Sequence, residues 1–110
     1  MKTPTEQALE FSSFQEFYPY YLSEHSDVNC RRLHFMGTTG VIALFVIAIA
    51  TANAWWLLAT PVMGYGFAWL GHFAFEHNKP ATFKFPLYSL AGDWVMYRDI
   101  LIGRVSLLRS

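Results

Sequence analysis

Histidines are the residues of this sequence whose type and spacing could support chemistry. Neutral imidazoles bind transition metals, and a carboxylate beside them completes the ligand set of many metal sites. His34 and His72 lie nineteen residues before and nineteen residues after Asn53. If the chain turns at Asn53 into two antiparallel helices, both imidazoles reach the same depth on neighbouring helices, where helical bundles commonly build metal sites.

A glutamate and further histidines extend this pair. Glu76 follows His72 by four residues, so both side chains project from one face of a helix. On one straight helix His25 would point away from the site, but an N-cap at Asp27 or Asn29 would break the helix and let His25 fold back. The predicted metal cluster consists of His25, His34, His72, and Glu76 or His77. It suits Fe(II) or Zn(II), and the residue types do not choose between these metals.

Other polar residues have weaker patterns. Asn78, Lys79, Asp93 and Arg98 are expected around the cluster, where they could orient ligands or hold an anionic head group. The single cysteine, Cys30, excludes an internal disulfide framework and a cysteine-rich zinc site. We expect Cys30 to be a small buried side chain.

The elements that position these residues are predicted to lie in a membrane. Hydrophobic residues make up 54% of the 110 residues and charged residues 15%. No Lys, Arg, Asp or Glu occurs between Arg32 and Glu76, a stretch about twice the roughly 20 residues that one spanning helix needs. Asn53, followed by Trp55 and Trp56, favours a turn at the headgroup boundary. The prediction is an all-α, integral membrane hairpin with helices near 34–52 and 54–75; a soluble core hairpin is the alternative.

The flanks and charges complete this picture of a single domain over residues 1–110. Apolar residues recur along 9–21 and 94–105 at helical spacing, which predicts amphipathic interfacial or re-entrant helices. Basic residues flank the hairpin at 31–32 and at 79 and 84, so both termini are expected in the cytosol, at a bacterial inner membrane or the endoplasmic reticulum. Eight basic residues balance eight acidic ones, so nothing indicates nucleic-acid binding.

Two long motifs resemble the Mpo-type 2-hydroxy fatty acid dioxygenase family, formerly a domain of unknown function. They are "YYLSEHSDVNCRRLHFMGT" and "AWLGHFAFEHNKPATFKFPLYSLAGDW". The family pattern has two histidines around an asparagine, then Gly-His with a glutamate four residues on, then Asn-basic-Pro-Ala. In this sequence it falls on His25, Asn29, His34, Gly71, His72, Glu76, Asn78, Lys79, Pro80 and Ala81. His77 occupies a variable position and is the weaker candidate ligand.

This resemblance implies Fe(II)- and O2-dependent removal of one carbon from long-chain 2-hydroxy fatty acids, a form of fatty acid α-oxidation. It implies metal binding by His25, His34 and His72, with Glu76 as a fourth ligand or as a partner fixing an imidazole. Glu76, Lys79 and Asp93 are then the catalytic candidates, and Lys79 or Arg98 would neutralise the substrate carboxylate. Fe(II) is favoured over Zn(II), membrane lipid surrounds the site, and a homodimer is left open.

Two rival functions are also compatible with the sequence. A small proton-coupled transporter could use Glu76 as its coupling carboxylate, but it would need more spanning helices or a dimer. A haem-binding membrane anchor could use His34 and His72 as axial ligands.

Overall fold

A computed structural model describes residues 11–79 and 84–109, so Leu9 of the N-terminal stripe and the motif residues Pro80 and Ala81 lie outside the described residues. Over the described ranges the protein is all helical, with no strand. Two short segments, the 3₁₀ helix η1 and the π-helix η2, flank α4. The elements are α2 (Phe14–Ser23), α3 (Val28–Ala50), η1 (Ala54–Ala59), α4 (Thr60–Gly71), η2 (His72–Glu76) and α5 (Pro86–Leu101).

The longest helix, α3, begins six residues before the expected start at 34. Its N-cap is Asp27, whose carboxylate accepts hydrogen bonds from the backbone N–H groups of Asn29 (2.8 Å) and Cys30 (3.3 Å). The prediction of a cap at Asp27 is therefore confirmed. Because a capped N-terminus satisfies backbone donors that would otherwise be unpaired, the helix extends back to the residue after the cap.

The segment expected as one helix over 54–75 changes helix type twice. Asn53 caps η1 by accepting a hydrogen bond from the Trp55 N–H at 3.0 Å. Pro61 lies in the first turn of α4, where its missing N–H costs no helical hydrogen bond, and so it starts a helix there instead of kinking one. At the other end α4 passes into η2, which carries His72.

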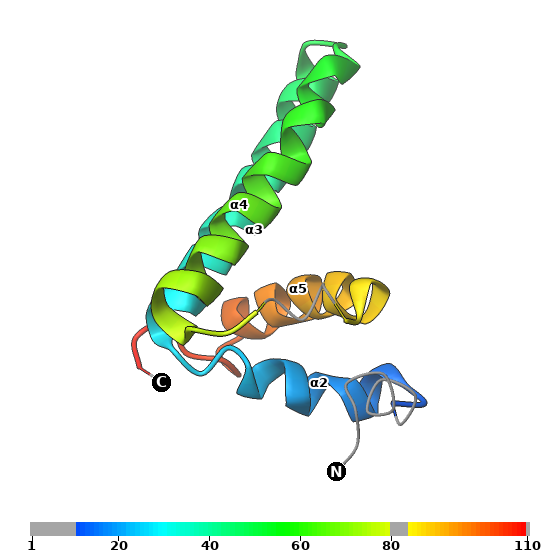
Figure 1. The fold of residues 1–110 in the computed structure, drawn as a ribbon. Helices are drawn as coiled ribbons and strands as arrows, with labels where there is room; N and C mark the ends of the chain where they lie inside the picture. Colours follow the sequence, from blue (N-terminus) through cyan, green and yellow to red (C-terminus); the bar gives the residue numbers. More distant parts are fainter. Residues whose placement is uncertain (1–10, 80–83, 110) are drawn as a thin grey trace.

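α3 and α4 run side by side in opposite directions as a long rod (Figure 1). Glycines let the two backbones approach closely. A Cβ on Gly37 would lie 3.1 Å from the Met63 carbonyl oxygen, and one on Gly71 would lie 3.0 Å from the Cys30 sulfur. Since any larger side chain would push the helices apart, these glycines set the spacing at which histidines on the two helices can meet.

The shorter helices α2 and α5 lie together across the foot of the rod (Figure 1). Their shared core holds Phe17, Tyr21, Phe85, Met96 and Val105. The Tyr18 hydroxyl also donates a 2.8 Å hydrogen bond to Asp99, which links α2 to α5. The aromatic stripe of residues 14–21 therefore packs largely against the protein's own α5.

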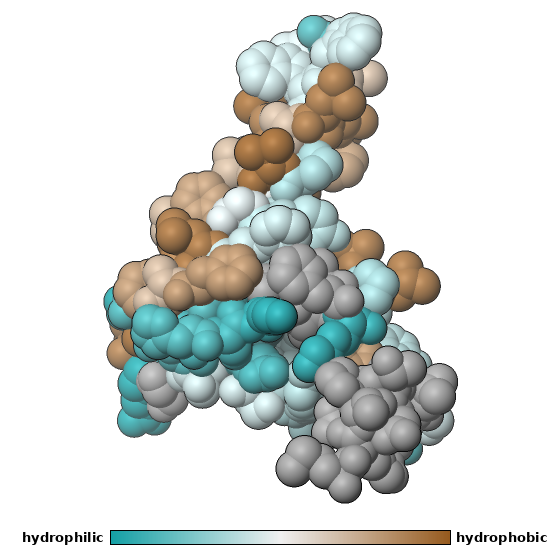
Figure 2. Space-filling model, in the orientation of Figure 1, coloured by the Kyte–Doolittle hydropathy of each residue, from teal (hydrophilic) through white to brown (hydrophobic). Residues whose placement is uncertain are grey.

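On the face drawn in Figure 2, most of the strongly apolar residues lie along the rod, and the most hydrophilic ones gather at its foot. Among the described residues, α3 is the one helix long and apolar enough to cross a membrane, with a mean hydropathy of 2.1 in its most apolar window. Only 22% of that window is buried inside the protein. Most residues of that window therefore lie outside the protein's own core.

Candidate metal centre

Three buried imidazoles meet at the foot of the rod. The Nε2 atom of His25 lies 3.1 Å from the Nε2 atom of His34 and 3.0 Å from that of His72. The ring centroids of His34 and His72 are 5.0 Å apart. His25 comes from the loop between α2 and α3, so the loop folds back onto the helix pair as the N-cap predicted. The exposed fractions of the three residues are 1%, 5% and 1%.

Each imidazole is hydrogen-bonded at its Nδ1 atom, on the side of the ring away from the other two histidines. The His25 Nδ1 lies 2.6 Å from the Tyr21 carbonyl oxygen, and the His34 Nδ1 lies 2.9 Å from the Cys30 carbonyl oxygen. The His72 Nδ1 lies 2.7 Å from the Asn78 side-chain oxygen. Because a carbonyl oxygen can only accept, Nδ1 carries the proton in all three rings, and the three Nε2 atoms have bare lone pairs.

Three bare lone pairs facing one another in a buried site repel unless a cation lies between them. Protonation offers no relief at His25, because burial and then the neighbouring His34 and His72 lower the pKa of His25 well below its ordinary value. Two nitrogens that bind one metal at about 2.1 Å and at right angles are about 3.0 Å apart, which matches the observed separations. The donor set therefore fits a divalent transition metal.

Cys30 completes the group of four residues whose ligand atoms lie within 4.8 Å of one another, together with the three histidines. This group could hold a metal ion. However, the Cys30 sulfur lies 3.7 Å from His34 Nδ1, on the opposite side of that ring from Nε2. The three imidazole Nε2 atoms are therefore the better-placed candidate ligands.

Glu76 and His77 lie outside this group. The Glu76 carboxylate accepts a 3.2 Å hydrogen bond from the Ser26 hydroxyl and a second, shorter one from the Asp27 backbone N–H. It thereby fixes the loop that carries His25. His77 is exposed and has a left-handed backbone with φ of 57°, a conformation in which histidine is enriched among non-glycine residues.

The π-helix η2 explains how Asn78 reaches the site. Its wide turns end at His77, and the Asn78 N–H then bonds back to the His72 carbonyl oxygen at 3.1 Å. This return places the Asn78 side chain against His72. The Asn78 amide N–H₂ donates to two oxygens of Glu24, the carboxylate oxygen at 3.2 Å and the backbone carbonyl oxygen at 3.3 Å. π-helical turns occur frequently at functional sites. The prediction that Asn78 lies beside the cluster is confirmed.

Tyr21 connects His25 to α5, whereas the sequence predicted for it only a place in an interfacial apolar stripe. Its ring stacks on His25 with centroids 4.1 Å apart, and its hydroxyl donates a short hydrogen bond to Asp93. Burial raises the pKa of the Asp93 carboxyl to about 6, and the Tyr21 hydroxyl partly opposes this shift. The four-residue spacing of Tyr21 and His25 was the signal available in the sequence.

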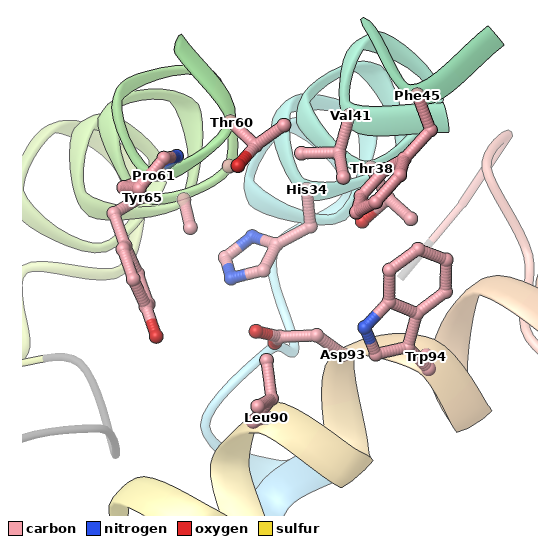
Figure 3. A pocket seen from close by; sticks show the side chains of 12 residues that line it. His34, Thr38, Val41, Phe45, Thr60, Pro61, Tyr65, Leu90, Asp93 and Trp94 are labelled. Atoms are coloured by element: carbon pink, nitrogen blue, oxygen red, sulfur yellow. The ribbon is translucent and has the colours of Figure 1, made fainter. Parts of the chain in front are cut away.

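The remaining candidates differ in their placement. Asp93 points toward His34 across a cavity between α3, α4 and α5 (Figure 3). Lys79 is exposed, beside Asn78 at the end of η2. Arg98 pairs with Asp99 at 3.1 Å and its side chain is 60% exposed. The structure therefore brings Asp93 to the cavity that His34 lines, but it leaves the Lys79 and Arg98 side chains at the surface.

Together, the helical fold and the buried imidazole cluster define a small helical protein with a group of side chains that could hold a metal ion. The family model described as "2-hydroxy-palmitic acid dioxygenase Mpo1-like" matches residues 11–105. Because this match covers most of the 110 residues, the chain belongs to that family. No curated protein and no solved structure gives a significant match.

Proposed function

We propose that this protein is an Fe(II)-dependent dioxygenase that removes one carbon from long-chain 2-hydroxy fatty acids at a membrane. The observation that carries the proposal is the convergence of three buried, bare Nε2 atoms. The description of the family supplies the substrate class and the reaction type. Bound there, Fe(II) would supply oxygen activation and a chelation point for the hydroxyl and carboxylate of the substrate.

The proposed topology is a membrane hairpin of α3 and the segment 54–76, with α2 and α5 at the cytosolic surface. The apolar rod and hydrophilic foot support this orientation (Figure 2). Arg31 and Arg32 lie at the foot, where their side chains donate hydrogen bonds to the carbonyl oxygens of Arg109 and Leu107 at 2.6 and 2.7 Å. A substrate could keep its tail in lipid while its head reaches the buried histidines.

Each polar residue around the centre has a proposed task. His25, His34 and His72 hold the metal, and Glu76 positions His25 through the Ser26–Asp27 backbone. Asp93 accepts a hydrogen bond from the substrate hydroxyl, since its carboxylate faces the cavity and its other contact is the Tyr21 hydroxyl. Lys79 or Arg98 neutralises the substrate carboxylate as it arrives at the surface.

The geometry favours this function over its two rivals. A haem held by His34 and His72 needs its macrocycle between the two rings, but those centroids are 5.0 Å apart and both rings also contact His25. A coupling carboxylate in a proton transporter should face a water path. Glu76 instead accepts hydrogen bonds from Ser26 and Asp27.

Turnover by purified protein tests the proposal. With Fe(II) and O2, 2-hydroxyhexadecanoate should yield a product one carbon shorter, measured by mass spectrometry. Hexadecanoate should not react, because it lacks the second oxygen needed for oriented binding. A chelator, exclusion of O2, or the change His34→Ala should stop the reaction, whereas His77→Ala should not. Turnover that persists without iron and oxygen would refute the dioxygenase assignment.

A further inference from the structure

A cavity of about 260 Å³ lies between α3, α4 and α5, and His34 of the three-histidine cluster lines it (Figure 3). One part of its wall is polar and carries His34 and Asp93, and most of the rest is apolar. The lining residues are His34, Thr38, Val41, Phe45, Thr60, Pro61, Gly64, Tyr65, Ala68, Leu90, Asp93 and Trp94. Such a combination of an apolar cavity with a few convergent polar groups is typical of a small-molecule site.

The cavity runs lengthwise along the rod. Its α3 residues (34, 38, 41 and 45) recur at three- to four-residue steps and so form one stripe of the helix. From His34 to Phe45 the helix rises about 16 Å. With C–C bonds of about 1.5 Å, an extended alkyl chain advances about 1.3 Å per carbon, so this stripe matches about twelve carbons. Phe45 is 46% exposed, so the far end opens to the surroundings of the rod.

We propose that this cavity binds the alkyl chain of the substrate, with the 2-hydroxy acid head at His34 and Asp93 and the tail running along α3 past Val41 toward Phe45. The inference rests on the proposed function and adds the place and direction of the tail. An alkyl chain fits because the wall between the polar end and Phe45 offers no charged side chain. Carbons beyond the twelfth extend into the lipid around the rod.

The test is equilibrium binding of two acids under anaerobic conditions, so that no turnover is needed. In the wild type, 2-hydroxyhexadecanoate should bind at least tenfold more tightly than 2-hydroxyoctanoate, since each buried methylene adds about fourfold to affinity. Val41→Trp fills the cavity about 10 Å along the helix from His34. The two acids should then bind with about equal affinity. The eight-carbon acid, which ends below residue 41, should keep its affinity.

A matched control lies on the same helix. Val46 is 59% exposed and does not line the cavity, so Val46→Trp should retain the wild-type preference. A second pair on α5 guards against misfolding of Val41→Trp: Leu90→Trp narrows the cavity, whereas Leu87→Trp changes an 81% exposed residue outside it. Leu90→Trp should lower the preference and Leu87→Trp should not.

Three results would overturn the proposal. The preference for the longer acid could be unchanged in both cavity variants, or both acids could lose affinity equally. A diacyl phospholipid could also bind as tightly as the longer acid and lose its affinity with the same substitutions. The last result would assign the cavity to a structural lipid. Because binding is measured without oxygen, absence of turnover in the wild type would count against the proposed function alone.

Discussion

At the scale of single residues, the tautomer of each imidazole decides which of its nitrogen atoms is free to bind a metal. Each Nδ1 has its own carbonyl acceptor, from Tyr21, Cys30 or Asn78, so each ring is fixed in orientation and in tautomer. Two of these acceptors belong to the backbone and cannot be removed by substitution. Asn78 is the only side chain among the three and is therefore the most informative residue to change.

His72 of η2 and His77, the residue that follows η2, should differ sharply when each is replaced by alanine. His72→Ala removes one of three converging nitrogens and should lower the iron content of anaerobically purified protein at least tenfold. His77→Ala changes an exposed residue and should leave iron stoichiometry close to wild type. Metal analysis of both variants checks this prediction. Loss of iron in His77→Ala with retention in His72→Ala would reverse the ligand assignment.

Asn78→Ala should weaken metal binding without abolishing it. The change frees His72 to rotate and removes the acceptor that fixes its tautomer, and such supporting contacts contribute about 10–100-fold to metal affinity. Competition with a chelator of known affinity measures the effect. Asn53→Ala, at the far end of the rod, is the matched control and should retain wild-type affinity. Equal affinities in the two variants would exclude a supporting role for Asn78.

At the scale of helices, two close contacts hold the centre together. The glycines of α3 and α4 let His34 and His72 meet, and Gly92 of α5 lies against the Tyr21 ring. A Cβ at Gly92 would lie 2.8 Å from that ring. Because the same ring stacks on His25, the packing of α5 on α2 also positions one of the three clustered histidines.

Gly92→Ala should therefore destabilise the protein by about 1–3 kcal/mol, the usual effect of overpacking a tight contact. Gly66→Ala is the matched control, because a Cβ there has no atom within 4 Å and alanine is the better helix former by about 0.5–1 kcal/mol. Thermal unfolding in detergent should give a lower Tm for Gly92→Ala and an unchanged or higher Tm for Gly66→Ala. The same Tm in both variants would contradict the close contact.

At the scale of the whole molecule, an apolar rod rises from a foot that holds the histidines and most of the charges. The molecule measures 52 × 30 × 25 Å along its principal axes, so the rod makes it long and narrow. Such a shape exposes much apolar surface, including Ile49 at 80% and Val62 at 75%. That surface is unfavourable in water and favourable in lipid.

The proposed membrane hairpin places two introduced cysteines on opposite sides of the membrane. Asn53→Cys at the exposed turn should react with an impermeant thiol reagent from the non-cytosolic side, and Arg104→Cys at the foot from the cytosolic side. The natural Cys30 is fully buried and should contribute little background. Labelling of both cysteines from one side would contradict the hairpin topology.

Local signals in the sequence were sufficient for much of the architecture. The uncharged stretch before Glu76, the turn at Asn53 and the cap at Asp27 each depend on residues close together in the chain. Helical geometry alone also brings His34 and His72 to one depth, because both are equally far from the turn. The ligand roles of these histidines remain predictions until metal content is measured.

Contacts between distant segments depended on packing that no local pattern encodes. Glu76 meets Asp27 across 49 residues and Tyr21 meets Asp93 across 72, so both partners became known only from the folded chain. The π-helical turn that brings Asn78 onto His72 likewise has no signature in the apolar periodicity. Spacing limits which side chains share a helix face, whereas the packing of α2 and α5 at the foot selects which of them meet.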